Sequence, residues 1–151
     1  MLQTLDLFAG VGGFALGLER TGGFRTAAFC EIDPDAVRTL NKNWPEVPVY
    51  GDVTVLTKER LDADGITINA ISGGFPCQDL SHARTGSGQG LGLALAGSRS
   101  GLWFHYQRLI GEIRPDWVII ENVSALLTQC LTPHSSAANH PAWRACYTKR
   151  A

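Results

Sequence analysis

Short apolar segments recur along this chain of 151 residues, and each ends at or just before a glycine or an acidic residue. The five segments span residues 4–8, 25–30, 47–50, 66–72 and 117–120. Residues 117–120 in particular are continuously apolar, which is typical of a strand that is buried on both faces of a parallel sheet. The pattern therefore predicts five strands, and it places the chemically informative residues where those strands end.

Apolar side chains at helical spacing fill the gaps between the predicted strands. Phe14 and Leu18 lie four residues apart after the first strand, and Asp33 with Pro34 opens a second helix. The inward residues of that second helix are Ala36, Val37, Leu40 and Trp44, and those of a later one are Leu102, Trp103, Tyr106, Leu109, Ile110 and Ile113. The alternation predicts an α/β fold with a doubly wound, mostly parallel sheet and ligands at the carboxyl ends of its strands.

The composition fits one globular domain, with 44% hydrophobic residues. No apolar stretch approaches the roughly 18 residues that span a bilayer, and the N-terminus does not resemble a signal peptide. The four cysteines show no CxxC spacing. These features predict a cytoplasmic protein that contacts no membrane. No metal is expected, since neither the cysteines nor His82, His105, His134 and His140 suggest a ligand set.

The net charge of −1 is unusual for a protein that binds nucleic acid through its own surface. All 14 acidic residues precede residue 122, whereas Arg144, Lys149 and Arg150 follow it. A basic end of three charges is usually a solvated one. If the protein acts on DNA, most of the surface that binds phosphate must therefore lie outside this chain.

A glycine-rich turn follows the first predicted strand, at Gly10, Gly12 and Gly13. Glycine lets the backbone turn tightly and approach a ligand closely. With Ala15 and Glu31, the turn also satisfies a dinucleotide-binding pattern. An NAD-dependent dehydrogenase therefore remains one alternative, and a glycine turn without a ligand is another.

Two acids and one aromatic residue outline an adenosine site at the ends of the first three strands. Glu31 follows the second strand, and a carboxylate suits two ribose hydroxyls because it only accepts hydrogen bonds. Asp52 follows the third strand and could accept from the adenine amine, while Phe8 offers an aromatic face. Either acid alone could equally be an ordinary residue before a helix or in a turn.

Cys77 and Glu121 follow the fourth and fifth predicted strands. The proline before Cys77 places the thiol in a turn, where a nucleophile would be exposed, whereas Cys30, Cys130 and Cys146 fit the usual role of small buried residues. Glu121 ends an apolar strand, so partial desolvation is expected to raise its pKa and make it a proton donor.

Taken together, these segments resemble the C5 cytosine-specific DNA methyltransferases over residues 4 to about 127. The matching motifs are residues 6–14, Glu31, residues 51–52, residues 74–78 and residues 121–123, and residues 99–103 resemble the segment after that family's mobile loop. The resemblance implies a Rossmann-like, class I S-adenosylmethionine-dependent fold. It also implies the cofactor-binding set Phe8, Gly10, Gly12, Gly13, Glu31, Ile32, Asp52, Val53, Pro76 and Leu102.

The same resemblance implies a mechanism in which a cytosine is flipped out of double-stranded DNA. Cys77 would attack C6 while Glu121 assists at N3, and C5 would then accept a methyl group from S-adenosylmethionine. Residues 81–98, rich in glycine and serine, would form the loop that closes over DNA. The expected setting is a restriction-modification system in a bacterial, archaeal or phage host cell.

The resemblance ends before the family's paired-arginine motif, recognition region and final cofactor motif. We therefore expect a partial methyltransferase domain over residues 1–127 and an irregular tail over 128–151 that reflects truncation or a frameshift. A complementing chain would then supply the recognition region. Two alternatives stay open, namely an inactive remnant that binds only the cofactor and a relative that acts on tRNA.

Overall fold

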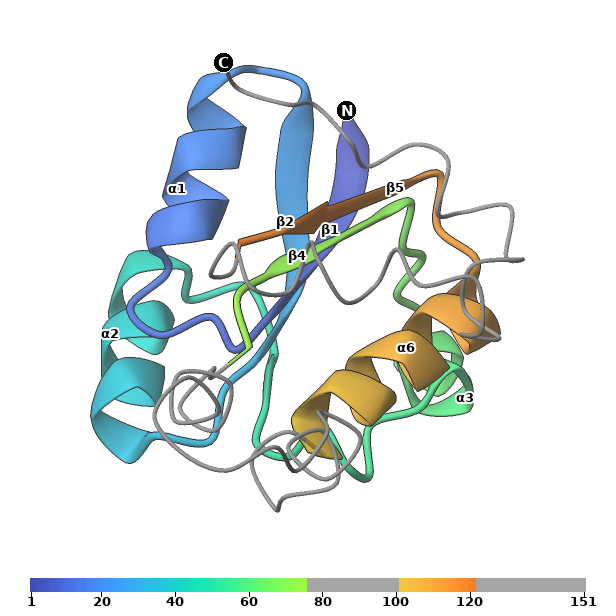
Figure 1. Cartoon of the computed structure of the whole chain (residues 1–151). Coiled ribbons are helices and arrows are strands. Elements are labelled where there is room, and N and C mark those ends of the chain that lie inside the picture. Colours follow the sequence, from blue (N-terminus) through green and yellow to red (C-terminus); the bar gives the residue numbers. More distant parts are fainter. Residues whose placement is uncertain (76–100, 122–151) are drawn as a thin grey trace, which may run out of the picture.

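The computed structural model describes residues 1–75 and 101–121. Five strands form one sheet: β1 (Leu2–Leu7), β2 (Phe24–Cys30), β3 (Val49–Tyr50), β4 (Ala70–Gly73) and β5 (Trp117–Ile120). Their order across the sheet is β3-β2-β1-β4-β5, and every neighbouring pair is parallel. The chain therefore winds outward from β1 in one direction and then from β4 in the other, which confirms the predicted doubly wound sheet (Figure 1).

Helices cover both faces of this sheet (Figure 1). The helices α1 (Gly13–Arg20) and α2 (Pro34–Asn43) lie on one face, and α3 (Lys58–Ala63) and α6 (Gly101–Ile113) lie on the other. Strand alternation sorts the side chains between the two layers. Leu5 and Leu7 belong to the core cluster beneath α3 and α6, whereas Phe29 packs with Ala15 and Leu40 beneath α1 and α2.

The second helix begins where the sequence predicts it. The side chain of Asp33 accepts hydrogen bonds from the backbone N–H groups of Asp35 (2.8 Å) and Ala36 (2.9 Å), and Pro34 occupies the first helical turn. At the other end, Trp44 packs edge-on against Phe29 with ring centroids 5.3 Å apart. Its indole N–H donates to Glu19 of α1 at 3.0 Å, so the two helices on this face are tied together.

Three predictions about elements were wrong in detail. Strand β4 begins at Ala70 rather than Ile66, because the backbone N–H of Ile66 closes the end of α3 by donating to the Leu61 carbonyl at 2.9 Å. Strand β3 begins at Val49 rather than Val47, whose N–H turns back to the Trp44 carbonyl at 3.1 Å. Helix α3 was not anticipated.

Strand β5 was predicted to be buried on both faces, and this prediction was also wrong. Its first residue, Trp117, is 49% exposed, and only Val118 is fully buried. The physical reason is position, since β5 lies at the end of the sheet order and pairs with β4 alone among the described strands. In the described part of the chain, no helix has the length and apolar character needed to cross a membrane.

Candidate cofactor site at the carboxyl edge of the sheet

The described site residues that were predicted from sequence share one edge of the sheet. Because all five strands are parallel, the residues after each strand meet at its carboxyl edge. Phe8, Glu31, Asp52 and Glu121 follow β1, β2, β3 and β5, respectively. The change in winding direction falls between β1 and β4, which is where doubly wound sheets bind their ligands.

Glu31 fastens the glycine-rich turn to the end of β2. One carboxylate oxygen accepts the N–H of Gly10 at 2.7 Å, and the other accepts those of Ile32 (2.9 Å) and Asp33 (2.8 Å). A carboxylate offers about four acceptor sites, so these three bonds leave room for one more. Glu31 can thus hold one ligand hydroxyl without releasing a backbone amide, rather than the two that the sequence suggested.

The glycines of this turn differ in what a side chain would contact at each position. At Gly12 (φ +85°), a Cβ atom would lie 2.6 Å from a ring carbon of Trp44 and 3.0 Å from Leu40, so packing beneath the turn excludes a side chain. A Cβ at Gly10 or Gly13 would meet no described atom within 4 Å. The space over those two residues therefore suits the close approach of a ligand, whereas Gly12 serves the fold.

Phe8 leaves the end of β1 in a conformation that is rare for a side chain of its size, with φ +55°. Its ring stacks on Tyr106 of α6 at a centroid distance of 6.4 Å and an interplanar angle of 17°. Tyr106 also meets Phe75 edge-on at 6.3 Å. The tyrosine thus holds together the residues that follow β1 and β4 at the switch point. Its helical spacing predicted a core residue, but not this place in the site.

Asp52 lies in a tight turn at the end of β3. Its carboxylate accepts the N–H of Thr54 at 2.8 Å. This bond is the main reason why the pKa of Asp52 lies below its ordinary value, and the charge of His105 on α6 lowers the pKa further. Asp52 is therefore an anion near neutral pH, and its carboxylate can accept a hydrogen bond from an amine.

The remaining cofactor residues predicted from sequence differ in exposure. Ile32 is 75% exposed beside Glu31, so its side chain is free to cover one face of a planar ligand. Val53 is buried in the core, which leaves its backbone as the accessible part. Leu102 is half-buried at the start of α6. Pro76 and Cys77 lie outside the described residues, directly after Phe75.

Glu121 lies beside Gly74, across the ends of β5 and β4. A Cβ at Gly74 would be 2.7 Å from a carboxylate oxygen of Glu121, so glycine makes room for this acid. The side chain of Glu121 is exposed in the described structure. Its carboxyl group is therefore accessible to a ligand at this edge of the sheet.

Two further ionisable groups lie close to the site. Asp6 is fully buried in β1 and accepts the Ser72 hydroxyl at 2.7 Å. Burial raises its pKa to about 6, and although Ser72 and the Ala15 amide lower the pKa in part, the charge of Glu31 raises it. Burial likewise raises the pKa of Cys30 to about 12, which fits an inert core thiol. Among the described residues, no group of three or more potential metal ligands occurs.

A doubly wound parallel sheet with a glycine-rich turn after its first strand and acids after the next two defines a Rossmann-like protein of the nucleotide-binding class. Comparison with known proteins identifies the family. Residues 2–134 match the model of the C-5 cytosine-specific DNA methylases, and the chain belongs to this family.

Curated relatives agree with this family. The chain is 39% identical over 130 residues to the type II methyltransferase M2.BsuMI of Bacillus subtilis, with 83% of this chain aligned to 30% of that protein. It is 41% identical over 126 residues to M.Eco47II of Escherichia coli, with 82% of this chain aligned to 27% of that protein. The chain therefore spans less than a third of the length of these two relatives.

Solved structures agree on the fold. A prophage-encoded DNA modification methyltransferase (E. coli) superposes with a TM-score of 0.67 at 30% identity, covering 95% of this chain and 37% of that one. Spodoptera frugiperda DNMT2 gives a TM-score of 0.63 at 19% identity, covering 85% of this chain and 38% of that one. The sheet is thus the Rossmann-like fold of the class I methyltransferases, and the expected class is confirmed.

Proposed function

We propose that this chain provides the S-adenosylmethionine site and the catalytic residues of a DNA (cytosine-5) methyltransferase of a restriction-modification system. The observation that carries the proposal is the fixed acceptor pair Glu31 and Asp52 on the same sheet edge as Glu121, in a member of this family. The NAD-dependent alternative finds no support in the family, whose members are cytosine methylases.

The described residues fit S-adenosylmethionine. Glu31 has one acceptor site left for a ribose hydroxyl, and Asp52 is an anion available to the adenine amine. Ile32 and the ring of Phe8 are apolar surfaces for the base, and the open space over Gly10 and Gly13 admits the methionine part. When bound, the cofactor supplies an electrophilic methyl group.

The chemistry on the DNA side is assigned to two residues. Cys77, as a thiolate, adds to C6 of a cytosine that has been flipped out of double-stranded DNA, and a carbon–sulfur bond forms. The carboxyl group of Glu121 donates to N3 of the same base, so that opening of the C5–C6 double bond makes C5 the nucleophile that accepts the methyl group. Loss of the C5 proton then restores the double bond and releases the Cys77 thiolate. The exposure of Glu121 leaves space for a base, which would itself exclude water from the carboxyl group.

The chain aligns with only part of each curated relative, so the activity proposed here is that of the whole protein. Less than a third of the two curated relatives is present, and the proposed substrates and partners belong to the whole protein. Residues 1–127 would then be the partial catalytic domain, acting in the cytoplasm with a complementing chain that recognises DNA.

Replacing Glu31 by alanine is expected to weaken S-adenosylmethionine binding by about tenfold or more, because a hydrogen bond to a charged acceptor contributes about 1.5–3 kcal/mol. Isothermal titration calorimetry measures the change. Glu46→Ala, an exposed acid outside the turn, should bind like the parent. Equal affinity of Glu31→Ala and the parent would remove Glu31 from the ribose site.

Cys77 is expected to form a covalent adduct with duplex DNA that carries 5-fluorocytosine at the target position, in the presence of S-adenosylmethionine and the complementing part of the enzyme. Fluorine at C5 blocks the final elimination, so the carbon–sulfur bond persists. Peptide mass spectrometry locates the adduct. Cys77→Ser should give none, and an adduct on Cys30, Cys130 or Cys146 would overturn the assignment.

A further inference from the structure

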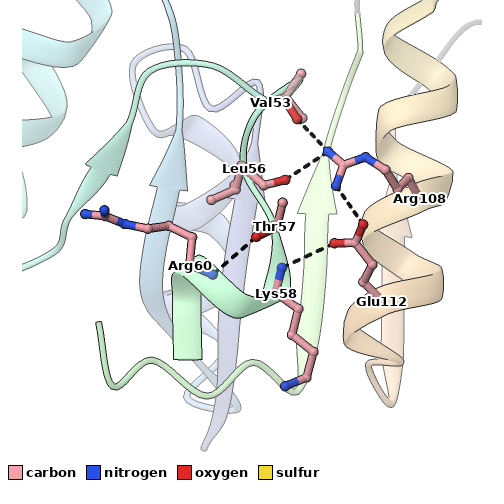
Figure 2. Close-up of polar contacts among 7 residues, drawn as sticks. All are labelled: Val53, Leu56, Thr57, Lys58, Arg60, Arg108 and Glu112. Atoms are coloured by element: carbon pink, nitrogen blue, oxygen red, sulfur yellow. Dashed lines mark hydrogen bonds and ion pairs between the residues drawn. The ribbon is translucent and has the colours of Figure 1, made fainter. Parts of the chain in front are cut away.

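Helix α6 holds the segment that follows β3 through one arginine (Figure 2). One terminal nitrogen of Arg108 donates to the backbone carbonyls of Val53 (2.9 Å) and Leu56 (2.8 Å), and the other donates to Glu112 at 2.8 Å. Glu112 in turn accepts the backbone N–H of Lys58 at 3.2 Å. Arg108 and Glu112 together thus hold residues 53–58 at both ends of that segment.

This segment carries Asp52 at its start. The N–H of Leu56 returns to the Asp52 carbonyl at 3.1 Å, and the N–H of Thr54 returns to the Asp52 side chain at 2.8 Å. The turn is therefore closed by its own amides, and the carbonyls of Val53 and Leu56 point outward to Arg108 (Figure 2). In the described part of the chain, these two carbonyls accept hydrogen bonds from Arg108 alone.

The bonds from Arg108 are well placed to resist movement. The arginine and Glu112 side chains are 30% and 28% exposed, respectively, so water competes less for them than for a surface pair. Hydrogen bonds with a charged donor are shorter and stronger than neutral ones. A planar guanidinium that is fixed by Glu112 can meet both carbonyls only if the turn keeps its present orientation.

We propose that Arg108 is a positioning residue that aims the Asp52 carboxylate at the adenine amine of the cofactor. In this role Arg108 acts through the backbone, by holding the carbonyls of Val53 and Leu56 in the turn that follows Asp52. Glu112 supports it by orienting the guanidinium. This inference rests on the proposed cofactor site and adds to it the element that fixes recognition of the base.

The test compares two ligands that differ at the purine edge proposed to face Asp52, namely in the group on C6 and in the hydrogen that hypoxanthine carries on N1. S-Adenosylhomocysteine presents an amine at C6 of the purine, whereas S-inosylhomocysteine presents a carbonyl, which a carboxylate repels. In the parent chain, the dissociation constant for S-inosylhomocysteine divided by that for S-adenosylhomocysteine measures the preference for the amine, and hence how well Asp52 is oriented toward it. Arg108→Met should reduce this ratio by about tenfold, within the range of coupling in one hydrogen-bond network.

Matched variants distinguish a change in the orientation of Asp52 from a general loss of structure. Arg60→Met removes a neighbouring arginine whose guanidinium pairs with Asp64 at 3.0 Å, so the ratio should not change. Arg108→Lys should restore part of the ratio. If Arg108→Met does not fold, Glu112→Gln serves instead, because it keeps an acceptor for Lys58 while removing the charge that orients Arg108, and the ratio should fall by about threefold.

The outcomes are distinct. A parent that binds neither ligand would refute the proposed cofactor function, and the inference with it. Binding without preference for S-adenosylhomocysteine would remove Asp52 from base recognition and overturn the inference alone. If Arg108→Met weakened both ligands equally, or neither, Arg108 would have only a general structural role. A reduced ratio with Arg60→Met unchanged is the supporting result.

Discussion

Replacing Gly73 by alanine is expected to abolish the cooperative folding of the chain, at a cost of more than about 4 kcal/mol, which is the exceptional end of single substitutions. Gly73 pairs with Leu7 across β4 and β1, and its φ of +142° suits only glycine. A Cβ there would lie 2.0 Å from the Leu7 carbonyl oxygen, a backbone atom that cannot rotate away. Urea denaturation followed by circular dichroism measures the loss.

A second glycine provides the control for this experiment. Gly111 lies within α6, where a Cβ would meet no described atom within 4 Å. Gly111→Ala should therefore stabilise the chain by about 0.5–1 kcal/mol, the usual gain for alanine inside a helix. A Gly73→Ala protein that unfolds within about 1 kcal/mol of the parent would contradict the close contact between β4 and β1.

Asp6 is expected to make the parent less stable as the pH rises from about 4 to about 6. Burial raises its folded pKa from 3.8 to about 6, so between these values the native state binds more protons than the unfolded chain. The stability that this group contributes is thus fully present below the unfolded pKa and is lost as the pH rises through the folded one. At 1.36 kcal/mol per pKa unit, the loss is about 3 kcal/mol.

The measurement is the free energy of unfolding of the parent and of Asp6→Asn at pH 4 and pH 7.5. Asparagine cannot ionise, so the variant should gain about 3 kcal/mol relative to the parent between these two pH values. Asp116→Asn, at an exposed acid, should follow the parent at both. Parallel curves for Asp6→Asn and the parent would show that Asp6 titrates normally in the folded chain.

Local sequence patterns were sufficient for the elements that depend on near neighbours. The start of α2 follows from Asp33 and Pro34, and the five strands follow from their apolar residues. Helix α3 was not predicted because it is six residues long and buries only Leu61. Its one local signal was Thr57, whose hydroxyl accepts the Arg60 N–H at 3.3 Å.

In the candidate site, too, the residues that follow a strand could be predicted, whereas contacts between residues distant in sequence could not. The positions of Glu31 and Asp52 could be predicted, because Glu31 directly follows β2 and Asp52 follows β3 after one glycine. The buried contact of Asp6 could not be predicted, because its partner Ser72 lies 66 residues away in sequence. Arg108 reaches carbonyls 55 and 52 residues away, and backbone carbonyls carry no sequence signal. The exposure of Glu121 depended on β5 being the end strand of the described sheet, which an apolar segment does not reveal.

The glycine-rich turn is preorganised by the protein itself. Glu31 accepts a hydrogen bond from the Gly10 amide, and Trp44 and Leu40 pack beneath Gly12. The conformational entropy of this turn is therefore lost during folding rather than during binding. The turn is therefore already in place when the proposed nucleoside ligand arrives. Association should then occur in one bimolecular step, without a slower rearrangement of this turn.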